Sequence, residues 1–189
     1  SSAASDVYKR QTQGLDGAVF QMVSHGLISG ALFLAIGVIY ERTHTRDINK
    51  LGDFATTMPK YSVFLMFFTL GSVGLPGTSG FIGEVLVLIG SWKVNPLVAI
   101  ISGFSLILGA IYMLRFYRKI SFGISENQDK YEIHDVNMRE FMILIPLVIF
   151  IILFGIFPNI VLNFLKVPHF LILETFRSVS YTHLTLPTT

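Results

Sequence analysis

The feature that most constrains this chain is an apolar segment interrupted in its middle. Residues 69–88 read TLGSVGLPGTSGFIGEVLVL, which is apolar enough to enter a membrane. Pro76 has no N–H and clashes with the carbonyl four residues before it, so a helix must open near this residue. Gly74 and Gly77 allow the freed backbone to turn. Opened backbone is tolerated at membrane depth only inside protein or beside a wet cavity, so the break indicates an ion or proton pathway.

Glu84, two turns after the break, is the strongest candidate for a functional residue. Its neighbours Val85 and Leu86 offer no salt bridge, whereas Gly80 and Gly83 leave room beside it for another helix or for water. Acids inside a bilayer are costly, and they mark ion and proton pathways. We therefore expect Glu84 to accept and release protons. The alternative is a structural carboxylate that caps the opened backbone.

The composition places most of the chain in a membrane. Of its 189 residues, 52% are hydrophobic and 14% are charged, which is too apolar for an ordinary soluble domain. The absence of cysteine excludes disulfides, Fe–S clusters and Cys-type zinc sites in this chain. The net charge of +2 is small, and the basic residues lie beside apolar spans, so they indicate membrane topology and not a nucleic-acid surface. No phosphate-binding or dinucleotide motif is present, so nothing here is expected to bind NADH.

Four apolar stretches are long enough to cross a bilayer core of about 30 Å. We predict spans at about 17–40, 61–92, 97–117 and 139–157, the second of them discontinuous. The apolar segment 160–176 is broken by Pro168, and we expect it to lie at the membrane interface. The connectors after the first and third spans hold most of the Lys and Arg, so both are expected on the cytoplasmic side.

The two ends of the chain differ in character from the body between them. Residues 1–11 and 177–189 are polar and without pattern. We interpret both as vector or adaptor sequence around an incomplete reading frame, with natural disordered tails as the alternative. Residues 12–176 form the expected membrane domain. Within it, Asn137 and Glu140 resemble a capping box, which predicts that a helix starts there.

His25, in the first span, is a second candidate for proton transfer. A neutral imidazole donates and accepts a hydrogen bond at once, so it can pass protons along a chain of water. The alternative is a hydrogen bond between helices. His44 and His134 lie in polar connectors without the ligand spacing of a metal site, so we expect no bound metal.

Three strings of this chain are specific in combination: SHGL, YERTHTRD and GLPGTSGFIGE. From about residue 12 to about residue 166 the chain resembles the antiporter-like subunit M family of respiratory complex I, the proton-pumping NADH:quinone oxidoreductase. The resemblance implies an all-α membrane fold of fourteen transmembrane helices. This chain would hold the last four, with the broken span as helix twelve.

The resemblance also implies roles for individual residues. It places Glu84 on the proton-transferring acid of helix twelve, where related antiporter subunits carry Lys, and His25 on the histidine of helix eleven in a central polar axis. Arg46 and Asp47 match a loop motif whose role we regard as structural or supportive. The helices with the family's Glu–Lys pair and central lysine would lie outside this chain, which alone would not contain a whole channel.

A subunit of this kind moves protons, while the redox chemistry takes place elsewhere. NADH, FMN, Fe–S clusters and quinone would be bound by other subunits, and no cofactor by this chain. The implied partners are the other membrane subunits of complex I and the lipid of a bacterial plasma membrane or another energy-transducing membrane. An Mrp-type cation/proton antiporter or a membrane-bound hydrogenase, which share the fold, is the alternative. A structural membrane protein without transport is a third.

Overall fold

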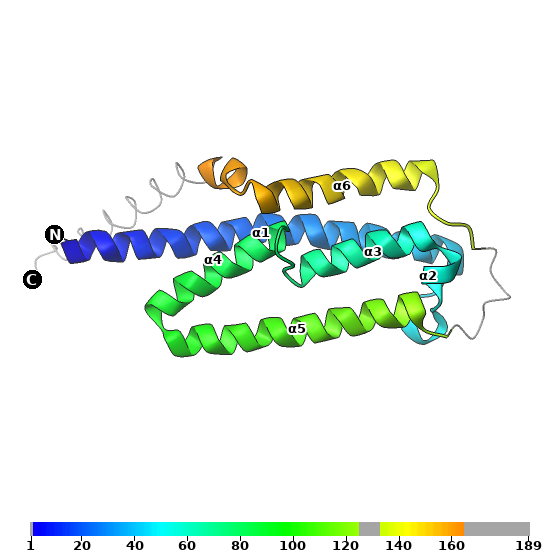
Figure 1. Ribbon diagram of the computed structural model, residues 1–189, viewed down its shortest axis with the longest axis horizontal. Helices are drawn as coiled ribbons and strands as arrows, with labels where there is room; N and C mark the ends of the chain where they lie inside the picture. Colours follow the sequence, from blue (N-terminus) through cyan, green and yellow to red (C-terminus); the bar gives the residue numbers. More distant parts are fainter. Residues whose placement is uncertain (1, 125–132, 165–189) are drawn as a thin grey trace, which may run out of the picture.

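The computed structural model describes residues 2–124 and 133–164, and the regular structure of these residues is helical. The predicted all-α fold class is therefore confirmed. Figure 1 shows long helices lying side by side along one axis. The elements in chain order are α1 (Ser2–Thr43), the 3-10 helix η1 (Ile48–Lys50), α2 (Phe54–Thr57), α3 (Pro59–Ser72), α4 (Ser79–Val94), α5 (Pro96–Phe122) and α6 (Met138–Ile156).

Three of these helices are long and apolar enough to cross a membrane. They are Gly14–Thr43 within α1, the whole of α5, and α6. The second predicted span consists of α3 and α4, which have 14 and 16 residues. At about 1.5 Å per residue each covers roughly half of a bilayer core or slightly more. In Figure 1 the two half-helices follow one another along the bundle, with the break between them.

The ends of the described chain bear on the predicted flanks. Helix α1 begins at Ser2, so it includes residues 2–11, where the sequence analysis expected vector sequence or a disordered tail. The helix continues there because no proline interrupts the segment, and Ala, Lys, Arg and Gln favour helical backbone. Residues 159–164 are also helical. The remainder of the predicted interfacial segment and the whole flank 177–189 lie outside the described residues.

The two connectors rich in Lys and Arg lie at the same end of the bundle. Figure 1 shows α2, the end of α5 and the start of α6 gathered there, with the short turn between α4 and α5 at the opposite end. Lys93 lies in the last turn of α4 at that end, and Asn95 caps α5 by accepting a hydrogen bond from the Leu97 N–H at 3.0 Å. This arrangement is the one that the positive-inside rule requires if both connectors face the cytoplasm.

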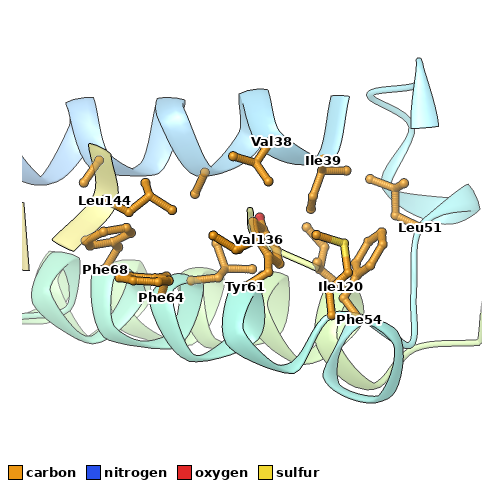
Figure 2. Packing of buried hydrophobic residues seen from close by; sticks show 14 of the residues in the cluster. Val38, Ile39, Leu51, Phe54, Tyr61, Phe64, Phe68, Ile120, Val136 and Leu144 are labelled. Carbon is orange, nitrogen blue, oxygen red and sulfur yellow. The ribbon is translucent and has the colours of Figure 1, made fainter. Parts of the chain in front are cut away.

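A cluster of buried apolar side chains holds α3 against α1 at the connector end (Figure 2). Val38 and Ile39 of α1 lie opposite Tyr61 of α3, whose side chain is completely buried. Phe64 stacks with Phe68 at a centroid distance of 6.2 Å. Aromatic pairs at such distances add to the packing energy, so this cluster fixes the first half of the broken span.

Small residues allow α1 and α4 to approach closely in an antiparallel pair. A Cβ built on Gly90 would lie 2.8 Å from Gly14 Cα, and one on Gly83 would lie 2.9 Å from Gln21 Cα. Between these helices Ser24 Oγ donates a buried hydrogen bond of 2.8 Å to the hydroxyl of Ser79. Close backbone approach and hydrogen bonds between helices are the main forces that pair helices in lipid. They set the register that positions Glu84.

Candidate functional site in the broken helix

Helix α3 ends in a Schellman-type turn. The Leu75 N–H donates to Leu70 O at 2.9 Å, and the Gly74 N–H donates to Gly71 O at 3.2 Å, which is the hydrogen-bond pair of this motif. Gly74 has a φ of 78°. Only glycine adopts this left-handed conformation without a steric penalty. The helix therefore opens where the sequence predicted, and it does so with its last carbonyls satisfied.

The unwound segment continues through Pro76 and Gly77, which has a φ of 93°. The Thr78 hydroxyl donates to Leu75 O at 2.7 Å, so it closes the turn and does not cap α4. Helix α6 lies against this backbone, because a Cβ built on Gly155 would come within 2.6 Å of the Gly77 carbonyl carbon. Helix α6 thus contacts the backbone at Gly77 and Thr78, whereas Leu75 and Pro76 remain exposed in the described chain. Opened backbone at membrane depth must be buried in protein or line a wet cavity.

Glu84 lies in the second turn of α4, and its carboxylate lies against the break. A Cβ built on Gly74 would overlap Glu84 Oε2 and lie 3.1 Å from Glu84 Cδ. No Lys, Arg or His of the described chain forms a salt bridge with Glu84. The N–H groups of Gly74, Leu75 and Thr78 all donate to backbone carbonyls. Capping of the opened backbone, the structural alternative for Glu84, therefore has no support at these three groups.

Glu84 and His25 both line a cavity of about 30 Å³. Its polar lining comes from Glu84 and Ser72 of the broken span and from Gln21, His25 and Ser29 of α1. The His25 Nε2 and Ser29 Oγ atoms are 3.1 Å apart, within hydrogen-bond distance. A cavity of this size and polarity can hold a water molecule. The geometry therefore provides a short polar connection between two groups that can carry a proton.

His25 itself lies on an exposed face of α1. Gly26 and Gly30 share this part of the helix, and a Cβ on either would meet no heavy atom of the described residues within 4 Å. Small residues on an open helix face allow a further helix to approach closely. The cavity around Glu84 is therefore bordered on one side by a face of α1 that the described chain does not cover.

Arg46 and Asp47 lie in the connector, and the structure does not bring them to the cavity. The Arg46 guanidinium lies over the Tyr40 ring, 4.9 Å from its centroid. Asp47 caps η1 by accepting a hydrogen bond of 3.0 Å from the Asn49 N–H. Both contacts are local to the connector, and they order the turn after α1.

The sequence analysis missed a second polar centre, the ion pair of Arg42 with Glu140. Both distances between the guanidinium and the carboxylate are 2.8 Å, and the side chains are only 12% and 11% exposed. Glu140 is also the last residue of the predicted capping box with Asn137, which the structure confirms. The capping pattern indicated only a local role for Glu140. Its partner lies 98 residues earlier in the chain, and no local pattern could indicate it.

Asp135 makes a structural contact that the sequence analysis did not identify. Its carboxylate accepts hydrogen bonds from the Lys60 N–H at 3.0 Å and the Tyr61 N–H at 3.1 Å. These groups belong to the first turn of α3, whose own cap residue Met58 makes no side-chain cap. Arg42 holds the same loop through a hydrogen bond of 2.7 Å from Nε to His134 O. The second polar centre therefore positions the start of the broken span.

An all-helical membrane bundle with one helix broken beside an acid defines an antiporter-like membrane protein. Over residues 5–111 the chain matches the family model described as NADH:quinone oxidoreductase/Mrp antiporter, TM. The chain belongs to this family, and it is a multi-pass integral membrane protein.

Individual relatives show which members of this family the chain is similar to. The chain is 48% identical over 155 residues to NADH-quinone oxidoreductase subunit M of Rhodobacter capsulatus, covering 82% of this chain and 30% of the relative. Its fold matches a chain of respiratory complex I from Thermus thermophilus with bound NADH, with a TM-score of 0.71, 32% identity, and coverage of 78% and 31%. An Mrp complex from Dietzia gives a TM-score of 0.67 at 18% identity, covering 78% of this chain and 36% of that one, a likeness of fold alone. The chain spans about a third of the length of the curated relatives it matches.

Proposed function

We propose that this chain is part of the proton-translocating membrane-arm subunit M of an NADH:quinone oxidoreductase. One observation carries the proposal: Glu84, which has no ionic partner in the described chain, shares a polar cavity with His25 beside a broken helix. The similarity to subunit M of Rhodobacter capsulatus supports the choice of complex within the family.

In this mechanism Glu84 takes up and releases a proton during each cycle. Its place beside the opened turn allows the carboxylate to be reached by water, which a continuous dry helix would exclude. His25 passes the proton between the Glu84 cavity and the uncovered face of α1, because an imidazole can accept a proton at one nitrogen while it donates from the other. Gly74, Pro76 and Gly77 maintain the opening, while Arg46 and Asp47 order the connector.

The redox chemistry takes place in other subunits. This chain has no cysteine that could ligate an Fe–S cluster. In this proposal it binds no cofactor, and NADH, FMN, Fe–S clusters and quinone are held elsewhere in the complex. Its partners are the other membrane subunits and the lipid bilayer, with a bacterial plasma membrane as the site.

A subunit of an Mrp-type cation/proton antiporter is the second candidate, because the description of the matching family model names the Mrp antiporter as well. The two candidates differ in what drives transport. Proton movement that depends on NADH oxidation supports the first, whereas sodium-dependent transport that proceeds without NADH supports the second.

The test of the proposal is a Glu84→Gln variant of the full-length subunit in its assembled complex. Gln keeps the size of the side chain but cannot release a proton, so proton uptake into membrane vesicles should fall for each NADH oxidised. A Glu84→Asp variant, which keeps a titratable carboxyl, serves as the matched control and should retain more of the uptake. Wild-type proton uptake and NADH turnover in Glu84→Gln would contradict the proposal.

A further inference from the structure

Gln21 has an unexplained polar side chain in the contact between α1 and α4. Its Oε1 atom is buried and has no hydrogen-bond partner among the described residues. The atom lies against Gly83, because a Cβ built on that glycine would overlap it and come within 3.0 Å of Gln21 Cβ. The close approach of α4 therefore restricts the amide. A buried amide oxygen without a donor is costly, so its environment should supply one.

A water molecule in the cavity that Gln21 lines can supply this donor. The volume of the cavity is about 30 Å³, and Gln21, His25, Ser72 and Glu84 contribute to its wall. A single water molecule needs roughly 10–15 Å³ and two to four polar partners, and this cavity meets both requirements. The amide of Gln21 can donate and accept, so it can hold such a water whichever way the amide is turned.

We propose that Gln21 holds one ordered water molecule in this cavity and that this water connects the Glu84 carboxylate to His25. Gln21 and His25 are four residues apart on one face of α1, and Glu84 faces them from α4. An amide does not itself titrate, so Gln21 is a positioning residue that acts through the water. The role of the water in proton transfer rests on the proposed function, but its presence does not.

The direct test is a high-resolution cryo-EM map of the assembled complex in which ordered waters are visible. We expect density within hydrogen-bond distance of both the Gln21 amide and the Glu84 carboxylate. In Gln21→Met, which keeps the length of the side chain but removes its amide, this density should be lost. Gly103→Ala is the control, because a Cβ there meets no heavy atom of the described chain within 4 Å, and the density should remain.

A functional measurement accompanies the map. The number of protons moved per NADH should fall in Gln21→Met and stay unchanged in Gly103→Ala. A dry cavity in the wild-type complex, or an unaltered water in Gln21→Met, would overturn the inference, and the wild-type map decides if the variant does not assemble. Normal pumping by Glu84→Gln with the water in place would instead overturn the proposed function and leave the water site standing.

Discussion

Two glutamates on neighbouring helices have opposite surroundings in this chain. Glu140 receives Arg42 on both carboxylate oxygens at 2.8 Å and accepts a further hydrogen bond of 2.9 Å from the Asn137 N–H. Glu84 has no ionic partner in the part of the chain that the structure describes, and it lies between an opened turn and a polar cavity. The Arg42 guanidinium stabilises the charged form of the Glu140 carboxylate, whereas no cation of the described chain does so for Glu84.

The comparison separates two uses of an acid in an apolar chain. An ion pair with every oxygen satisfied ties helices together, because removal of either partner leaves a buried charge uncompensated. An acid without a charged partner inside a membrane is costly, and such residues are candidates for ion and proton pathways. The presence or absence of a charged partner therefore distinguishes the two carboxylates in the described chain.

The largest effect is expected at the satisfied pair. Arg42→Gln removes the cation from a carboxylate that is only 11% exposed, and the loss of one partner of a buried pair costs about 3–5 kcal/mol. It also loosens the loop that carries Asp135 and therefore the first turn of α3. We expect a lower amount of assembled complex and a lower midpoint of thermal denaturation.

Arg46→Gln is the matched control for this prediction. The Arg46 guanidinium lies over the exposed ring of Tyr40, and such a contact is worth about 0.5–1 kcal/mol. Equal losses of thermal stability in the two variants would show that the Arg42–Glu140 pair has no special structural role.

The second-largest effect is expected at the two glycines of the break. Comparing them separates the loss caused by disturbing Glu84 from the loss caused by backbone strain alone. Gly74→Ala and Gly77→Ala each place a Cβ on a residue with positive φ, at a cost of about 1–2 kcal/mol. At Gly74 the new methyl also overlaps the Glu84 carboxylate, whereas at Gly77 it meets nothing within 4 Å in the part of the chain that the structure describes. We expect both variants to be less stable, but proton uptake per assembled complex to fall more in Gly74→Ala.

Gly74→Ala and Gly77→Ala can also give a result that contradicts the role of the break in positioning Glu84. Similar proton uptake per assembled complex in the two alanine variants would mean that the position of the Glu84 carboxylate beside the turn is unimportant.

The smallest effect concerns the helix pair that sets the register of the site. Ser24→Ala removes the buried hydrogen bond of 2.8 Å to Ser79, and such bonds in membrane proteins contribute about 0.6 kcal/mol on average. The double variant Ser24→Ala/Ser79→Ala should lose no more stability than the single variant, since no hydroxyl is left unpaired. Thermal denaturation of the assembled complex measures both, and additive losses would show that the two hydroxyls are not coupled.

Local chemistry made part of this structure predictable. Pro76 with its flanking glycines predicted the opening of the helix from sterics alone, and Asn137 with Glu140 predicted the start of α6 through the capping box. Both depend on residues within a few positions of each other, so the sequence contains all the information.

The contacts between helices were not predictable in the same way. The shared cavity of Glu84 and His25 depends on the register of α1 against α4, which the contacts of Gly83 and Gly90 determine. The Arg42–Glu140 pair joins residues 98 positions apart. Such contacts follow from packing of the whole bundle, and the sequence gives no local signal for them.

The central claim is that Glu84 carries protons and Glu140 does not. The most direct test compares the number of protons moved per NADH oxidised in Glu84→Gln and Glu140→Gln, each in the assembled complex and each corrected for the amount of complex. The account predicts that this ratio falls in Glu84→Gln and stays at the wild-type value in Glu140→Gln, whose effect is on stability. An unchanged ratio in Glu84→Gln, or an equal fall in both variants, would contradict it.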